Sequence, residues 1–267
     1  MTEYIYSPKK IYYKKNEFKS DRPTLLFIHG ISGSSSAWRL YEEKFGDQYN
    51  VLTFDLRGHG KSAKLPNLED YAISKFAEDV FDLTAYLNIK SFILVSHSFG
   101  VLIALEFMAN HMNMVEKVIF LSPNYAPNKI TAAKIVRPLF KLVGLLKILP
   151  FSATGKGHID YNRFQNTGDW NIPRMIADIG NTSLRVYLFG SRQSYEVDYE
   201  TVISQINIPT LIIHGKKDSI FPVTGAIEMA DKIKKSKLVL SDEADHILVL
   251  NKFPEVSQAI EVFVNGK

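Results

Sequence analysis

Cysteine is absent from this 267-residue sequence, and tryptophan occurs only twice. Without cysteine, the chain can form no disulfide, no thiol nucleophile and no cysteine-ligated zinc or iron–sulfur site. It needs no such link to fold, because a chain of this length buries about three quarters of the surface that it exposes when unfolded. At roughly 100–200 residues per domain, the length fits one large domain or one domain with an insertion. Seven histidines remain as candidates for acid–base chemistry.

A strong excess of one charge is also lacking, since 32 Lys and Arg face 28 Asp and Glu for a net charge of +4. So small and diffuse a charge gives no indication of nucleic-acid binding. The longest uncharged run, residues 91–105, is too short and too polar to cross a bilayer. The first residues lack the apolar core and cleavage site of a secretory signal. We therefore expect no nucleic-acid partner, no stable membrane insertion and a cytoplasmic location.

Short apolar runs alternate with amphipathic helical stretches, which is typical of an α/β protein with a mostly parallel sheet. An opening hairpin is predicted from residues 4–6 and 11–15, with a turn at Ser7-Pro8. Further strands are predicted at residues 24–28, 51–54, 92–95, 118–121, 209–213 and 237–240. Helices are predicted around residues 38–45 and at residues 73–87, 101–108, 223–234 and 255–264.

The alternation stops over residues 123–199, which predicts an insertion between two parts of one core domain, residues 1–122 and 200–267. The insertion has an apolar stripe interleaved with basic residues. The stripe consists of Ile130, Ile135, Leu139, Phe140, Val143 and Leu146, and the basic residues are Lys129, Lys134, Arg137 and Lys141. A helix of this kind could lie on a membrane surface. We favour a cap helix whose apolar face covers a pocket.

The segment Ser96-His97-Ser98-Phe99-Gly100 falls where a predicted strand turns into a predicted helix. In a nucleophile elbow, such a turn lifts one side chain above the sheet edge, and the residues two before and two after it must be small. The lifted residue here is Ser98. The usual pattern is G-x-S-x-G, so Ser96 stands in place of the first glycine, with modest crowding expected. His97 precedes the nucleophile, and we expect its side chain to point away and to be structural.

A serine nucleophile needs a base, and the base needs a carboxylate to fix its tautomer. In α/β proteins with a nucleophile elbow, the chain order is serine, then acid, then histidine. The order excludes His29, His59 and His97 as the base, and we interpret His29 and His59 as loop-stabilising residues. Among His111, His158, His214 and His246, only His246 lies in a loop beyond the last strand with a carboxylate upstream. His246 is therefore the predicted base.

Asp218 is the predicted acid, because it follows the strand at residues 209–213 and so lies at the carboxyl edge of the sheet. Asp242, Glu243 and Asp245 are rivals by proximity. Asp245 is disfavoured, because neighbouring side chains in an extended loop point apart. Asp218 could alternatively cap only the helix that follows it.

An acyl-transfer enzyme also needs two backbone N–H donors for the developing oxyanion. One is predicted from Phe99, directly after the nucleophile, and the other from Ile31 in the Ser/Gly-rich loop after the strand at residues 24–28. Ser32 and Trp38 are candidates to line the substrate pocket, although Trp38 and Phe99 could equally be core residues.

Taken together, these motifs resemble the α/β-hydrolase superfamily, and more narrowly its cap-bearing serine hydrolases and esterases. The residues that carry the resemblance are His29-Gly30, Asp55-x-Arg57-Gly58-His59-Gly60-x-Ser62, the elbow at Ser98, His214-Gly215-x-x-Asp218 and Asp245-His246. The resemblance implies an eight-stranded sheet flanked by helices, a Ser98–Asp218–His246 triad and a helical cap inserted after the sixth strand. Related haloalkane dehalogenases and epoxide hydrolases carry an Asp at the elbow, where this chain has Ser98.

The leading functional expectation is hydrolysis of a carboxylic ester of small-to-medium size through an acyl-enzyme, with no metal or organic cofactor. An apolar cap favours a lipophilic, uncharged acyl group, because pocket walls match what they bind. Alternatives with the same triad are carbon–carbon bond hydrolysis, acyl transfer and perhydrolysis. A slow-turnover ligand sensor or signalling protein is a further alternative, because fold alone does not determine function.

Overall fold

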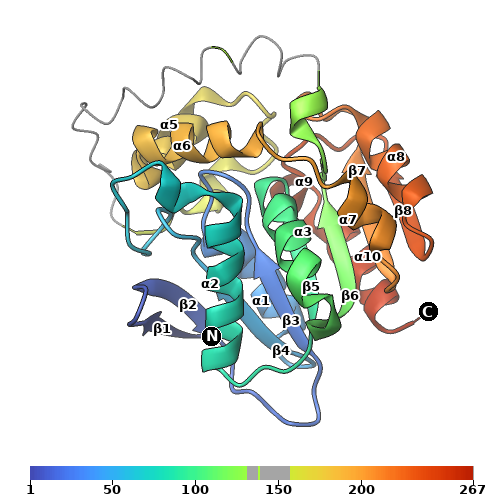
Figure 1. The fold of residues 1–267 in the computed structure, drawn as a ribbon, viewed down its shortest axis with the longest axis horizontal. Helices are drawn as coiled ribbons and strands as arrows, with labels where there is room; N and C mark the ends of the chain where they lie inside the picture. Colours follow the sequence, from blue (N-terminus) through green and yellow to red (C-terminus); the bar gives the residue numbers. More distant parts are fainter. Residues whose placement is uncertain (131–137, 139–156, 267) are drawn as a thin grey trace.

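The computed structural model describes residues 1–130, 138 and 157–266 (Figure 1). An eight-stranded sheet runs through the described part of the molecule in the order β1-β2-β4-β3-β5-β6-β7-β8. The strands are β1 (Thr2–Tyr6), β2 (Ile11–Lys15), β3 (Thr24–Ile28), β4 (Asn50–Phe54), β5 (Phe92–His97), β6 (Val115–Leu121), β7 (Thr210–Gly215) and β8 (Ser236–Ser241). β1 and β2 are antiparallel to their neighbours, and all other pairs are parallel. The predicted fold class is confirmed.

The central strands form where the sequence has continuous apolar runs, because helices cover both faces of a parallel sheet. Every residue of β3, β4 and β5 is buried. β3 pairs with β4 on one side and β5 on the other, in registers that place Phe27 opposite Thr53 and Val95. The carboxyl ends of these strands therefore meet at one edge of the sheet, where the loops after β3, β5, β7 and β8 carry the predicted site residues.

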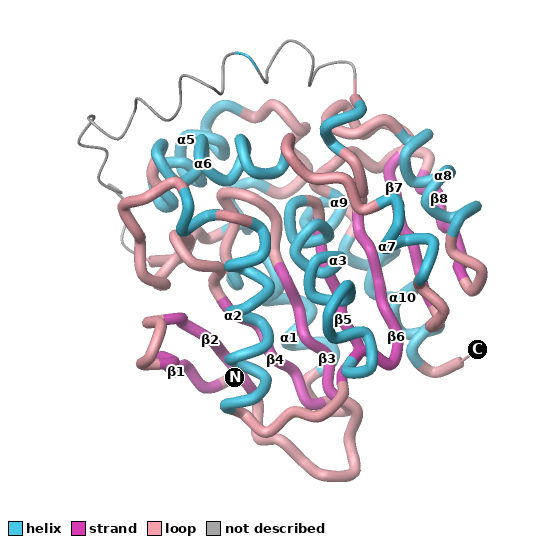
Figure 2. The backbone as a smooth tube through the Cα atoms, in the orientation of Figure 1, coloured by secondary structure: helices cyan, strands magenta, loops and turns pink. Residues whose placement is uncertain are grey.

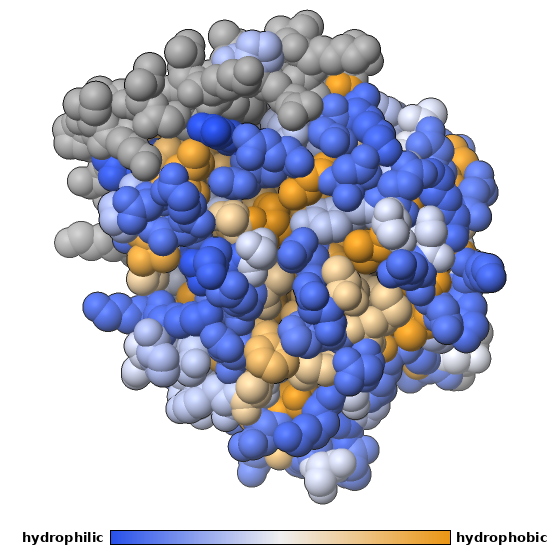
Figure 3. Space-filling model, in the orientation of Figure 1, coloured by the Kyte–Doolittle hydropathy of each residue, from blue (hydrophilic) through white to orange (hydrophobic). Residues whose placement is uncertain are grey.

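Two layers of helices enclose the sheet (Figures 1 and 2). One face packs against α2 (Ile73–Tyr86), α3 (Phe99–His111), α7 (Glu200–Gln205) and α8 (Val223–Lys232). The other packs against α1 (Arg39–Phe45), α9 (Leu248–Asn251) and α10 (Phe253–Val264). The outer surface of the first layer is mainly hydrophilic, with scattered apolar side chains (Figure 3). α2 is amphipathic, as predicted, since Ile73, Phe76 and Val80 are buried.

The region between β6 and β7 has no strand among its described residues. It contains α5 (Ile172–Thr182) and α6 (Leu184–Ser194), which lie across the carboxyl edge of the sheet (Figure 1). The boundaries 123–199 of a separate cap remain a prediction. Most of the apolar stripe with its lysines lies outside the described residues, apart from Lys129 and Ile130 at its start. No helix in the described ranges is long and apolar enough to cross a membrane.

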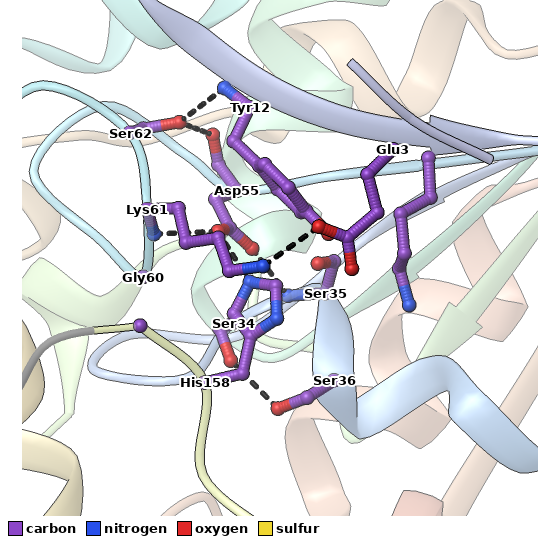
Figure 4. Close-up of polar contacts among 12 residues, drawn as sticks. Glu3, Tyr12, Ser34, Ser35, Ser36, Asp55, Gly60, Lys61, Ser62 and His158 are labelled. Atoms are coloured by element: carbon purple, nitrogen blue, oxygen red, sulfur yellow. Dashed lines mark hydrogen bonds and ion pairs between the residues drawn. The ribbon is translucent and has the colours of Figure 1, made fainter. Parts of the chain in front are cut away.

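A hydrogen bond between two side chains joins this inserted region to the core (Figure 4). His158 points toward Asp55, with 2.7 Å between His158 Nε2 and Asp55 Oδ2. The Asp55 carboxylate, fully buried, also accepts hydrogen bonds from the backbone N–H groups of Ser35 and Lys61, both at 2.8 Å. Burial alone would raise the pKa of Asp55, but the hydrogen bond and charge of His158 hold it below the usual range. Asp55, from the DxRGHGxS run, thus holds loops and the inserted segment together.

Candidate active site

Ser98 lies at the turn between β5 and α3 in a conformation that is rare for a residue with a side chain. Its φ is 52° and its ψ is −116°. Such strained backbone persists only where the surroundings fix it, and it concentrates at functional sites. Here the Ser98 N–H donates to Leu121 O at 3.0 Å, and the Val101 N–H donates to Ser98 O at 2.9 Å. The predicted elbow geometry is present.

Gly100 shows why this turn requires a small residue two positions after the nucleophile. A Cβ atom at position 100 would lie 2.7 Å from Ile28 O and 2.8 Å from His29 O, which are backbone atoms of the neighbouring strand. Ser96, on the other side of Ser98, fits between Ile28 and Phe120 in the sheet register. Its hydroxyl is buried and has no hydrogen-bond partner among the described residues.

We expect Ser96→Ala to raise the free energy of unfolding by about 1 kcal/mol, because it removes a buried hydroxyl that forms no hydrogen bond. Urea unfolding measures the effect. The matched control is Ser62→Ala, since Ser62 Oγ donates to Asp55 O at 2.7 Å and accepts from the Tyr12 N–H at 2.9 Å. Ser62→Ala should be destabilising. Equal losses in both variants would contradict the assignment of an unpaired Ser96 hydroxyl.

His246 lies in the loop between β8 and α9, within hydrogen-bond distance of the nucleophile. Its Nε2 is 2.7 Å from Ser98 Oγ, and its Nδ1 is 2.8 Å from Asp218 Oδ2. The His246 ring and the Ser98 hydroxyl are both largely buried. The structure therefore brings together three residues that are far apart in the sequence, Ser98, Asp218 and His246.

Asp218 lies in the loop after β7, where backbone N–H groups of the same loop hold its side chain in place. Its Oδ1 accepts hydrogen bonds from the N–H groups of Ile220 at 2.9 Å and Phe221 at 2.8 Å. The side chain is fully buried, and His214 Nε2 lies 3.3 Å from Asp218 Oδ2. Burial would raise the pKa of Asp218, but the hydrogen bond and charge of His246, with the Phe221 N–H, hold the pKa below its usual range. Asp218 is therefore ionised at neutral pH.

This arrangement selects one tautomer of the histidine. An ionised Asp218 can only accept a hydrogen bond, so His246 Nδ1 carries the proton and donates it. When the ring is neutral, His246 Nε2 is the lone-pair nitrogen and accepts from the Ser98 hydroxyl. The geometry is suited to removing the Ser98 proton as the oxygen attacks.

The rival carboxylates lie elsewhere. Asp242 and Glu243 form ion pairs with Lys216 and Lys217 on the surface. Asp245 accepts hydrogen bonds from the Ile247 N–H and from Asn251 Nδ2. The carboxylate bonded to His246 Nδ1 is that of Asp218.

A cleft of about 230 Å³ opens above Ser98 and His246. Ile31, Ser32 and Phe99 line it. The roles of Ile31 and Phe99 as oxyanion donors stay a prediction. Phe99 is the first residue of α3, so its N–H has no acceptor within the helix. Other lining residues come from the inserted region, with apolar Met175 and Ile179 and polar Asp169, Arg174, Asp178, Tyr187 and Ser191.

Trp38 does not line this cleft. Of the two roles that the sequence left open for Trp38, pocket and core, the structure places it in the core. Its side chain is fully buried on the other face of the sheet, where it packs against Phe27 and Tyr41 at ring distances of 5.1 and 5.3 Å. A large apolar residue in a loop at the sheet edge can turn inward, and here the short helix at Ser35–Trp38 directs it into the core.

The expectation that the His97 side chain points away from the site is wrong. Its Nε2 lies 2.9 Å from His246 O, and its ring is 5.3 Å from the His246 ring. Burial lowers the pKa of His97 to about 3, with His246 adding to the effect, so the ring is neutral and its Nε2 donates. His97 therefore supports the backbone of the residue that contacts Ser98.

A buried polar group in the inserted region was not predicted from the sequence. Asp169, Arg174 and Asp178 line the cleft and are each more than nine tenths buried. A signal was present, because Arg174 and Asp178 are spaced i, i+4 in α5 among the apolar residues Ile172, Ile176 and Ile179. Within the described ranges, no group of three or more His, Asp or Glu residues is arranged to hold a metal ion.

The chain is similar to several known proteins. A sequence model of the alpha/beta hydrolase fold matches residues 23–253. Epoxide hydrolase 1 of Caenorhabditis elegans is 23% identical over an aligned length of 265 residues, and the match covers 92% of this chain but only 65% of the nematode protein. Putative carbamate hydrolase RutD of Agrobacterium fabrum is 24% identical over 251 residues, 85% of this chain and 87% of that protein.

Among solved structures, the enol-lactonase from Burkholderia xenovorans LB400 superimposes with a TM-score of 0.74 at 19% identity. The match covers 99% of this chain and 100% of the lactonase. Similarity at this level of identity shows a shared fold.

Proposed function

The chain belongs to the alpha/beta hydrolase fold family, and we propose that it hydrolyses a carboxylic ester through an acyl-enzyme on Ser98. The observation that carries the proposal is the hydrogen-bonded series Ser98 Oγ, His246 Nε2, His246 Nδ1 and Asp218 Oδ2 at the floor of a cleft. Membership of this family supports a hydrolytic activity. The ester substrate is our proposal.

In the proposed reaction, Ser98 Oγ attacks the ester carbonyl while His246 Nε2 takes the hydroxyl proton. Asp218 stabilises the imidazolium that forms. His246 then returns the proton to the leaving alcohol, and Ser98 keeps the acyl group. His246 then removes a proton from water, and the resulting oxygen attacks the acyl carbon. As the bond between Ser98 Oγ and the acyl carbon breaks, His246 returns this proton to Ser98 Oγ, and the carboxylic acid leaves. The N–H groups of Ile31 and Phe99 would stabilise the oxyanion in both steps.

The identity of the nucleophile separates this proposal from epoxide opening. The nematode relative carries the name epoxide hydrolase. The resemblance to the superfamily implies an aspartate at the elbow of epoxide hydrolases, where this chain has Ser98. Ser98 would leave no carboxylate to attack an epoxide carbon. The Agrobacterium relative is named as a carbamate hydrolase, and a carbamate, like an ester, is attacked at a carbonyl carbon.

The lining of the cleft supports a substrate of small-to-medium size with an apolar acyl group. Phe99, Leu102, Met175 and Ile179 contribute apolar walls, and the volume of about 230 Å³ limits the size of the bound part. Carbon–carbon bond hydrolysis, acyl transfer, perhydrolysis and slow-turnover ligand sensing use the same triad and are outcomes of the test below.

We expect a fluorophosphonate probe to label the protein at Ser98, as mapped by mass spectrometry of the labelled peptide. The same preparation should hydrolyse p-nitrophenyl esters, with kcat/KM highest for short-to-medium acyl chains. Labelling at Ser98 without ester turnover would favour one of the alternatives. If the probe fails to label Ser98 at all, the acyl-enzyme mechanism itself is excluded.

A further inference from the structure

The carboxylate of Asp169 contacts both loops that carry the partners of Ser98. Its Oδ1 accepts a hydrogen bond from the His246 N–H at 2.8 Å. Its Oδ2 accepts from the Ser219 N–H at 2.9 Å and from the Ser219 hydroxyl at 2.7 Å. Ser219 directly follows Asp218. One side chain thus joins the loop after β7 to the loop after β8.

The backbone of His246 is held at both ends. Its carbonyl oxygen accepts from Ser122 Oγ at 3.0 Å and from His97 Nε2 at 2.9 Å. These two partners belong to the ends of β6 and β5, whereas the partner of the N–H, Asp169, belongs to the region between β6 and β7. The position of the imidazole therefore depends on a residue of the inserted region as well as on the core.

Asp169 is itself fixed by a buried network. Arg174 Nη2 donates to Asp169 O at 2.6 Å, and Arg174 Nη1 lies 3.4 Å from Asp178 Oδ2. The Tyr161 hydroxyl donates to Asp178 Oδ1 at 2.8 Å. The Asp169 residue is only 8% exposed. A charge-assisted hydrogen bond in such a buried place is stronger and better defined than one on the surface.

We propose that Asp169 is a positioning residue for the hydrolytic reaction, which fixes His246 relative to Asp218 and thereby couples the inserted region to the triad. The inference rests on the proposed function of Ser98, His246 and Asp218. Its physical basis is that displacement of a reacting group by about 1 Å can lower the rate about 100-fold. Asp169 does not exchange a proton with Ser98 or with the substrate.

The test compares Asp169→Asn with Asp169→Ala on the full chain. Asparagine keeps the size of the side chain but replaces one carboxylate oxygen with an amide nitrogen that only donates. Because His246 and Ser219 donate to different oxygens of Asp169, one of these two residues loses its acceptor. We expect kcat to fall about 10-fold to 100-fold in both variants, with KM changed less than about twofold. The matched control is Asp160→Asn in the same region, because the exposed Asp160 caps a short helix and contacts neither loop.

A second readout does not depend on a substrate. The proton between His246 Nδ1 and Asp218 gives a low-field ¹H resonance, which should shift or broaden in Asp169→Asn and stay unchanged in Asp160→Asn. If wild type shows no ester hydrolysis, the proposed function fails while this resonance still tests the positioning role. Ser219→Ala removes only one of the contacts and should lower kcat by a smaller factor, which serves if the Asp169 variants do not fold.

Three results would overturn the proposal. A rise in KM at constant kcat would make Asp169 a substrate-binding residue. Full activity in Asp169→Asn beside a loss in Asp169→Ala would mean that the side chain only fills space. An unchanged low-field resonance in both variants would show that Asp169 does not hold His246 in place.

Discussion

Replacing Ser98 with alanine is expected to lower kcat for a p-nitrophenyl ester by about 10⁴-fold to 10⁶-fold, with little change in KM. The residue supplies the atom that attacks the carbonyl, and the backbone donors alone leave only a small residual rate over water. The folded structure should persist, because the strained turn is fixed by the Ser98 N–H bond to Leu121 O and not by the hydroxyl.

The His246→Ala variant should lose about as much activity, and the Ser98→Ala/His246→Ala double variant no more than either single one. Groups that act as a unit are not additive, since neither can work without the other. The 2.7 Å contact between Ser98 Oγ and His246 Nε2 makes these two such a unit. Steady-state kinetics measures the cycle, with Ser91→Ala as control, because Ser91 is exposed and lies directly before β5. Additive losses would mean that the two residues act in separate steps.

Most of the fold could be predicted because its core strands are continuous apolar runs. The run at residues 92–95 is too short to form a helix and ends at a turn motif, and it became the start of β5, paired on both sides. The predicted elbow at Ser98 likewise depended on local features, namely a strand, a tight turn and small neighbours. Local sequence determines such features directly.

The placement of Asp169 could not be predicted, because nothing local ties it to residues that follow it by 50 and 77 positions. Its role emerges only when two loops from separate strands arrive beside it. Trp38 is the opposite case. A tryptophan side chain fits a substrate pocket or a core equally well. Only the path of the chain after β3 determines that Trp38 lies in the core. Residues 131–137 and 139–156, where most of the predicted cap stripe falls, are outside the described structure.

We expect the free energy of unfolding to fall as the pH decreases below 6.5, before most carboxylates begin to take up protons. Burial lowers the pKa of His29 to about 4 and the pKa values of His59 and His97 to about 3. All three side chains are almost fully buried. In the unfolded chain the same groups titrate near 6.5. Between pH 6.5 and about 4, the unfolded state therefore binds protons that the native state does not.

The sign follows from proton linkage. Stability rises with pH wherever the unfolded state holds more protons, so the contribution of these histidines is complete above pH 6.5 and is lost as the pH falls. At pH 5 the loss is about 2 kcal/mol for each histidine. Asp178 opposes it, because burial raises its pKa to about 6 and the native state gains a proton there. That gain offsets about 1.4 kcal/mol at pH 5.

The net loss of about 4–5 kcal/mol at pH 5 is a large share of the 5–15 kcal/mol that stabilises a typical domain. Urea unfolding at pH 7.5, 6 and 5 should show a steep fall in the free energy of unfolding over this range. The His59→Asn variant isolates one of the three groups, because it removes a buried ring whose Nε2 has no hydrogen-bond partner in the described part of the chain. For this variant, the free energy of unfolding should change less steeply with pH than in wild type. The difference in slope should correspond to at most one proton taken up on unfolding, whatever the stability at pH 7.5. A wild-type free energy of unfolding that stays constant from pH 7.5 to 5 would contradict this prediction. It would mean that the three buried histidines are protonated in the folded state, which requires water to reach their rings.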